Sequence, residues 1–468
     1  MSTDDQAAAA TGLSRSLAHR HVTMISIGGI IGAGLFVGSS VVIAGAGPAA
    51  VLSYIASGVL IVLLMQMLGE MAVACPSIRS FSEFTRAGLG AGAGFVAGWL
   101  YWYFWVVVIP VEAIAGAVLL QAWIALPTWI LGLALMAAMT GVNLMSARSY
   151  GEFEFWFASI KVAAIIVFIA LAAAYVVSGA PPGRVTADLS HVGGFAPHGA
   201  LAVLAGVATV FFAMTGAEIT TVAAAESAEP ARAIAGMTRS VIFRIVVFYV
   251  VSIFFIVAVV PWDRVTPGFS PFTLALSAIG HSWVARAIGV VILTAVLSCL
   301  NSAFYVCSRV LFVLAENGDA PRWLVKLNAR RVPARSVAVG AIVGVLGILA
   351  NAAASSSVFA FLVNAGGALI VFVYMLTAIA QIRLRFAQRR EGRPEPAVRI
   401  WAFPWLSYAT VAGLIAVLAA MALTPDLASQ LYVSLVALAV AVLAYLLLRR
   451  QRTAAKNRAD LELTSKPS

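Results

Sequence analysis

The sequence is poor in charge. Only 10% of its 468 residues are Asp, Glu, Lys or Arg, whereas 62% are apolar. A soluble domain carries about 25% charged residues, so this chain lacks the residues for a water-facing shell, and it has no long hydrophilic stretch to form a separate soluble domain. A membrane-spanning helix needs about 20 apolar residues. The composition therefore predicts an all-α polytopic membrane protein.

Cysteine and histidine are scarce as well. Cys75, Cys299 and Cys307 are odd in number and lie in or near apolar segments, which excludes a disulfide framework and provides no metal-ligand spacing. All five histidines lie in the N-terminal segment or in expected loops, so a membrane metalloenzyme would lack its ligands. The first 20 residues have no apolar core of a signal peptide. We expect no metal, no cofactor and no enzymatic activity.

Twelve apolar segments, bounded by charged residues or by Gly and Pro, are expected to span the membrane. In chain order they are 22–43, 49–74, 95–122, 127–146, 153–178, 200–224, 239–261, 283–314, 335–352, 357–382, 402–423 and 428–448. We therefore expect one transmembrane domain over 22–450, with a cytoplasmic tail at 1–21 and another, disordered, at 451–468.

Two of these segments contain residues that suit a helix interior poorly. The first has glycines at 28, 29, 32 and 34, and the sixth contains Thr215-Gly216, followed by Glu218. These interruptions correspond if 22–178 and 200–382 are two repeats and 402–448 lies outside them. Paired interruptions are typical of transporters built from inverted repeats, with the binding site near the membrane midplane. Glycines also allow helices to pack closely. That alternative accounts for the glycines of the first segment taken alone, but it accounts less well for two interruptions at corresponding positions.

The positive charges are distributed unevenly. Of 30 Lys and Arg residues, only Arg184, Arg264 and Arg286 fall on the side opposite the N-terminus, and Lys161 lies inside span 5. By the positive-inside rule both termini are expected in the cytoplasm. Topology and anionic lipid headgroups thus account for the net charge of +11, and no nucleic-acid partner is expected.

Several motifs resemble those of the bacterial amino acid permeases of the amino acid–polyamine–organocation superfamily. They are Gly28–Phe36, Gly69–Ala72, Gly98–Trp105, Tyr150–Phe157, Ala223–Ser227 and Ser298–Ser302. The similarity extends from about Leu13 to Arg450 and is greatest to the 4-aminobutyrate (GABA) permeases, through Phe36–Ser40 and Trp99–Glu112. The resemblance implies a LeuT-type five-plus-five inverted repeat with spans 11 and 12 outside it. One departure, Gly32-Ala33-Gly34 in place of Gly-Ala-Ser, leaves the choice of amino acid open.

The resemblance implies a secondary active transporter that imports an amino acid, GABA or a related one, across the bacterial inner membrane. The expected mechanism is proton symport with alternating access, and the expected partners are the substrate, protons and the lipid bilayer. An amino acid exchanger and a proton-coupled permease for a different amino acid are the alternatives. A disulfide-linked accessory subunit is not expected, because the loop 121–128 between spans 3 and 4 contains no cysteine.

A broken helix suits a zwitterion. Backbone N–H groups at the start of the outer half of span 1 carry the positive end of the helix dipole and can bind a carboxylate. Freed carbonyls, which by resemblance are those of Ile30, Phe212 and Thr215, can accept hydrogen bonds from an ammonium group. The candidate substrate-binding residues are Ile30, Gly32, Ala33, Gly34, Phe212, Thr215, Gly216 and Asn301.

Lys161 lies about ten residues into span 5, so at about 1.5 Å per residue it is about 15 Å deep. Ionisable groups inside a membrane are costly and are functional candidates, and a buried lysine can lose its proton. The resemblance places Lys161 where sodium sits in sodium-coupled relatives; the alternative is a structural pin. Glu218 is the second candidate for proton coupling. Glu112 stays open between structure and function, and Glu70 is expected to make a packing or gate contact.

Overall fold

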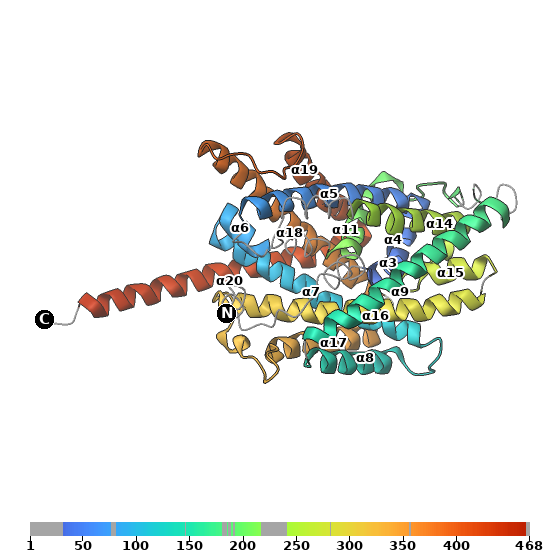
Figure 1. Cartoon of the computed structure of the whole chain (residues 1–468), viewed down its shortest axis with the longest axis horizontal. Coiled ribbons are helices and arrows are strands. Elements are labelled where there is room, and N and C mark those ends of the chain that lie inside the picture. Colours follow the sequence, from blue (N-terminus) through green and yellow to red (C-terminus); the bar gives the residue numbers. More distant parts are fainter. Residues whose placement is uncertain are drawn as a thin grey trace.

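All regular structure in the described part of the chain is helical (Figure 1). This computed structural model describes residues 31–75, 81–145, 147–179, 185, 189–190, 192–216, 241–280, 282–354 and 357–464. Within those ranges, nine helical segments are long and apolar enough to cross a membrane, and two further apolar helices are shorter. All twelve expected spans correspond to described helices, which confirms the all-α polytopic fold.

The first repeat begins with a broken helix and a tight corner. Its helices are α3 (Ala33–Phe36), α4 (Ser39–Ala46), α5 (Ala50–Ala74), α6 (Phe81–Leu89), α7 (Ala91–Leu120), α8 (Thr128–Asn143) and α9 (Ala147–Ala174). Gly47 makes the corner between α4 and α5 with a φ of 65°, a conformation that favours glycine. A Cβ atom there would lie 2.5 Å from the Pro197 ring.

The second repeat and the two extra helices follow the same order of elements. They are α11 (Gly199–Met214), a π-helical segment (Ile245–Val251) leading into α14 (Ser252–Val259), α15 (Pro271–Ala278), α16 (Ser282–Glu316), α17 (Ala334–Ala354), α18 (Ser357–Arg390), α19 (Trp405–Leu423) and α20 (Pro425–Thr464). Most of the expected span boundaries agree with the helices to within a few residues. Helix α9 begins earlier than span 5, and α18 and α20 continue beyond the ends of spans 10 and 12. The start of span 1, the end of span 6 and the start of span 7 lie outside the described residues.

Two groups of helices surround the interruptions. Spans 3, 4, 8 and 9, which are α7, α8, α16 and α17, pack on one another, as corresponding members of two repeats should. Helix α4 of span 1 and α5 of span 2 both pack against α11 of span 6. Helix α9 packs against α16 and α14, and α18 packs against α7, α11 and α5. The interruptions therefore lie between the two groups.

Two features differ from what the sequence suggests. The short helix α6 lies between spans 2 and 3 with Phe84 fully buried, and a Cβ at its Gly88 would lie 2.8 Å from the Cα of Ala380. The expectation of a disordered tail is wrong, because α20 continues to Thr464 and projects from the helical bundle (Figure 1). Its last part is rich in Ala, Leu, Arg and Lys, which favour helix over coil.

Candidate functional site

In span 1 the described chain begins with the non-helical residues Ile31 and Gly32, and α3 starts at Ala33. Gly32 has an extended backbone (φ −134°, ψ −152°). A Cβ atom on Gly32 would lie 2.5 Å from the Cβ of Cys299 and 2.8 Å from a carboxylate oxygen of Glu112. No other residue fits here without displacing α7 or α16. Helix α3 thus begins within the predicted break of span 1, and the half of the span before Ile31 lies outside the described residues.

A carboxylate of the protein already lies at this helix start. The N–H of Ala33 donates to both carboxylate oxygens of Glu112, at 3.1 and 3.0 Å. Glu112 comes from α7, and its side chain is 1% exposed. The first N–H groups of a helix lack partners within the helix and carry a partial positive charge. The start of α3 is therefore occupied by a carboxylate of the protein itself.

Lys161 belongs to the same buried group. Its side chain is fully buried in α9, and its ammonium group donates to the hydroxyl of Ser298 in α16 at 2.8 Å. The Glu112 carboxylate lies within hydrogen-bonding reach of the Cys299 thiol and within electrostatic reach of the Lys161 ammonium. Spans 1, 3, 5 and 8 thus meet around one acid and one base. Sequence reasoning named both groups but had no signal that would bring them together.

Span 6 is interrupted directly after Met214, where α11 ends. Thr215 is extended (ψ 145°), and Gly216 has a φ of 111°, which favours glycine. The Thr215 hydroxyl donates back to the carbonyl of Phe211 at 2.7 Å, and the Tyr249 hydroxyl donates to the carbonyl of Ala213 at 2.9 Å. Helix α11 thus ends where the second break is predicted, and side-chain hydroxyls bind two of its C-terminal carbonyls; the rest of span 6 lies outside the described residues.

The two broken helices touch each other without an intervening side chain. A Cβ atom on Gly34 would lie 2.7 Å from the Cα of Ala213 in α11. We reasoned from the sequence that a small residue at position 34 gives a carboxylate access to the backbone. The structure provides a different reason, because a side chain there would first strike the backbone of span 6.

The remaining predicted site residues lie around this centre or outside the described residues. Phe212 borders the second break and packs edge-to-face on Phe104 of α7, with ring centroids 5.7 Å apart. Asn301 accepts a hydrogen bond from Asn143 of α8 at 2.7 Å, so it is engaged in a contact between helices. Ile30 and Glu218 fall outside the part of the chain that the structure describes.

A profile of the amino acid permease family matches residues 21–458. The chain belongs to this family. It is 40% identical over 453 residues to a gamma-aminobutyric acid permease of Bacillus subtilis. The alignment covers 96% of this chain and 97% of that protein. It is 47% identical over 419 residues to a probable GABA permease of Pseudomonas aeruginosa, with 88% of each chain covered. It is 36% identical over 448 residues to the aromatic amino acid transport protein AroP of Escherichia coli K12, covering 95% and 97%.

Solved structures show the fold of the permease. A manganese transporter of Eremococcus coleocola matches with a TM-score of 0.58 at 14% sequence identity, over 93% of this chain and 95% of that one. At this identity the likeness concerns the fold alone, and it confirms the inverted-repeat transporter architecture. The relatives are permeases rather than enzymes, so the permease transports an amino acid and performs no catalysis.

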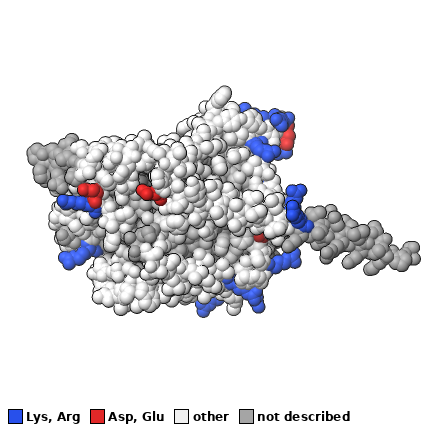
Figure 2. Space-filling model, turned by 180° about the vertical axis from the view of Figure 1, so that it is seen from behind, with Lys and Arg blue, Asp and Glu red and all other residues white. Residues whose placement is uncertain are grey.

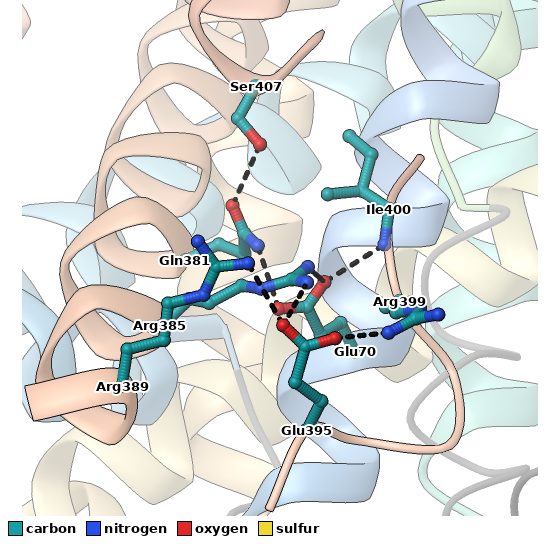
Figure 3. A network of polar contacts seen from close by, with 8 residues as sticks. All are labelled: Glu70, Gln381, Arg385, Arg389, Glu395, Arg399, Ile400 and Ser407. Atoms are coloured by element: carbon teal, nitrogen blue, oxygen red, sulfur yellow. Dashed lines mark hydrogen bonds and ion pairs between the residues drawn. The ribbon is translucent and has the colours of Figure 1, made fainter. Parts of the chain in front are cut away.

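A second buried acid of the permease, Glu70, lies near the C-terminal end of α5 and is 2% exposed (Figure 3). One of its oxygens accepts from the amide of Gln381 at 3.0 Å. The other accepts from the Arg385 guanidinium at 2.8 Å and from the backbone N–H of Ile400 at 2.9 Å. The expected packing contact is confirmed, and it joins span 2 to span 10 and to the linker before span 11.

A ring of exposed charge surrounds this contact. Glu395 in the linker accepts a hydrogen bond from Arg389 at 2.9 Å and another from Arg399, and it lies 3.6 Å from Arg385 (Figure 3). The hydrogen bonds from Arg389 and Arg399 lower the pKa of the Glu395 carboxyl below its ordinary value. Because these groups are exposed to solvent, the ring adds less stability than the Glu70 contact inside it.

We expect Glu70→Ala to destabilise the permease strongly. The substitution leaves the Arg385 guanidinium, which is 4% exposed, without its buried carboxylate. Losing one partner of a buried ion pair costs about 3–5 kcal/mol. Thermal unfolding in detergent measures the effect, and Glu391→Gln is the control, because the ion pair of Glu391 with Arg393 is exposed. Equal melting temperatures for the two variants would contradict the role given to Glu70.

Proposed function

We propose that the permease imports GABA or a related amino acid by proton symport. The observation that carries this proposal is the Glu112 carboxylate on the N–H of Ala33. The carboxylate of an amino acid has the same chemistry and fits the same donor. The relatives at 40% and 47% identity, named as GABA permeases, favour GABA within this class.

Two carboxylates compete for one helix start. Like charges that share a site are unfavourable, so the arrival of a substrate carboxylate favours a Glu112 that carries a proton. Lys161 is in electrostatic reach of Glu112, so a proton gained or lost at this buried pair changes the charge beside the helix start. Substrate binding and proton binding are thereby linked, which is the requirement for symport. Glu218 remains the second candidate for proton coupling.

The ammonium end of the substrate requires acceptors rather than a base. The helix ends at the two breaks provide carbonyl groups, and the candidates remain those of Ile30, Phe212 and Thr215. Because hydroxyl groups of the protein already bind the carbonyls of Phe211 and Ala213, those two are less available. The side chain of Phe212 would cover the substrate from α11.

The deciding experiment is uptake into proteoliposomes with an imposed pH gradient, across a panel of amino acids that includes GABA. We expect accumulation of GABA or a related amino acid when the outside is acidic, and we expect an uncoupler to abolish it. Uptake that ignores the gradient and the uncoupler but requires an internal amino acid would contradict symport and indicate an exchanger.

We also expect that removing the substrate carboxylate abolishes competition. n-Butylamine keeps the amine and carbon chain of GABA but has no anionic group for the N–H of Ala33. Its inhibition constant against labelled GABA should be weaker by at least about a hundredfold, as for loss of a charge-assisted hydrogen bond at a buried site. Equal competition by n-butylamine and GABA would show that the helix start is not the anion site.

The proposed location is the inner membrane of a bacterium with both termini in the cytoplasm. Figure 2 shows basic side chains gathered at the end of the molecule from which α20 projects. Arg264, beside Asp263, lies in the segment after span 7 at the other end. This distribution supports the proposed orientation by the positive-inside rule. Labelling of single cysteines at the two termini in intact cells and in inverted vesicles tests it.

A further inference from the structure

A cavity of about 620 Å³ lies beside the two broken helices, apart from the Glu112 group. One wall is the outer half of span 1 with Val41, and a second is α11 with Leu201. The opposite wall is the hairpin between α19 and α20, including Leu423 and Leu427. Cavities of this size hold small organic ligands.

A side-chain amide that is almost fully buried lines this cavity, and only one of its two polar atoms makes a hydrogen bond within the described residues. Asn364 of α18 is 3% exposed and accepts a hydrogen bond from the Thr209 hydroxyl of α11 at 2.6 Å. Its amide group makes no other hydrogen bond among the described residues. The nitrogen of a side-chain amide is a hydrogen-bond donor, and Asn364 lines the cavity. The second polar atom of the amide is therefore available to a ligand in the cavity.

The charge of the lining is negative. Asp426, in the first turn of α20, is exposed at the cavity and is the one acidic or basic side chain among the described lining residues, apart from His198. The His198 ring donates through Nδ1 to the Gly45 carbonyl at 2.8 Å and packs edge-on against Trp262, with ring centroids 5.1 Å apart. A carboxylate beside an aromatic ring favours an organic cation.

We propose that this cavity is a second ligand site, distinct from the amino acid site, for a primary ammonium ion with an apolar body. Its ammonium group pairs with Asp426, its body contacts the valine and leucine walls, and a polar substituent reaches Asn364. The occupant bridges the outer halves of spans 1 and 6 to the hairpin between α19 and α20. A bound ligand holds these helices in place and therefore slows transport. This effect on uptake rests on the proposed transport function, whereas binding to the cavity does not.

The test uses 4-phenylbutylammonium as the probe, with 4-phenylbutanol and 4-phenylbutanoate as uncharged and anionic controls. Equilibrium dialysis against purified permease at pH 8, where an ordinary imidazole is neutral, measures binding without transport. We expect saturable binding of the ammonium compound and weaker binding of both controls. Asp426→Asn should weaken the ammonium compound about fivefold, as for loss of one exposed ion pair, and leave the alcohol unchanged. Ala202→Phe, which places a phenyl ring in the cavity, should weaken the binding of all three compounds.

Glu391→Gln is the matched control, because it removes an exposed carboxylate far along the chain from the cavity. In proteoliposomes the ammonium compound should lower the maximal rate of uptake without raising the KM for the amino acid. The proposal would be overturned if 4-phenylbutylammonium bound equally to the wild type and to the Asp426→Asn and Ala202→Phe variants. It would also be overturned if 4-phenylbutanol bound to the wild type as tightly as 4-phenylbutylammonium. If the wild type shows no uptake at all, the transport proposal fails, but the binding measurements still decide whether the cavity is a ligand site.

Discussion

Lys161→Gln should lose all accumulation driven by a pH gradient while retaining substrate binding and counterflow. Glutamine keeps a polar side chain of nearly the same length near Ser298 but removes the positive charge close to Glu112. The anion site at Ala33 is untouched, because its N–H belongs to the backbone. Binding, counterflow and gradient-driven uptake should be measured on one purified variant.

The matched control for this variant is Ser298→Ala. It removes the hydrogen-bond partner of Lys161 but keeps the charge, so we expect accumulation to persist with a loss of stability of about 1 kcal/mol. If Lys161 were only a structural pin, Lys161→Gln would instead lose binding, counterflow and about 3–5 kcal/mol of stability together. Full accumulation in a well-folded Lys161→Gln protein would end the proposed mechanism.

Gly34→Leu should abolish substrate binding altogether. The new side chain would meet the backbone of α11 at Ala213, which lies 2.7 Å from the position of its Cβ. A helix backbone does not give way as a flexible side chain does, so spans 1 and 6 must separate and both breaks lose their geometry. Overpacking of a core costs about 1–3 kcal/mol, and a clash with backbone costs more.

The control for the glycine substitution is Gly141→Leu in α8. A Cβ atom on Gly141 meets nothing within 4 Å, so the variant should bind substrate and unfold like the wild type. Binding of labelled GABA and the melting temperature, measured side by side, separate loss of the site from loss of the fold. Wild-type affinity in Gly34→Leu would refute the close contact of the two broken helices.

The sequence predicted the spans, the start of α3 and the end of α11 well because each is encoded locally. Apolar runs of sufficient length fix the spans, and Gly32 and Thr215-Gly216 fix the breaks, since these residues leave a helix readily. Helix α6 was not predicted, because nine residues with few apolar positions carry too weak a signal against the neighbouring spans. The last part of α20 was mistaken for a disordered tail because its high charge outweighed its helix propensity.

The composition of the candidate site was less predictable. The contact between Ala33 and Glu112 joins residues 79 positions apart, and it depends on how α7 packs beside the break. A single acidic residue in an apolar span signals importance, but its partner is determined by tertiary packing. The same applies to Ser298 and Cys299, which look like ordinary small residues of span 8. Gly34 was predicted to give a carboxylate access to the backbone, and its close contact with Ala213 of α11 could not be foreseen from the sequence.

The Glu70 contact also determines which substitutions related sequences can accept at the positions that bind it. Gln381 and Arg385 bind Glu70 through their side chains, so a change at either position alters the contact. Ile400 binds it through the backbone N–H, which every residue except proline possesses. As far as Glu70 is concerned, position 400 can therefore exchange freely among non-proline residues. An alignment of relatives would show no preference there for a polar or charged partner, so covariation between the two positions would fail to reveal this contact.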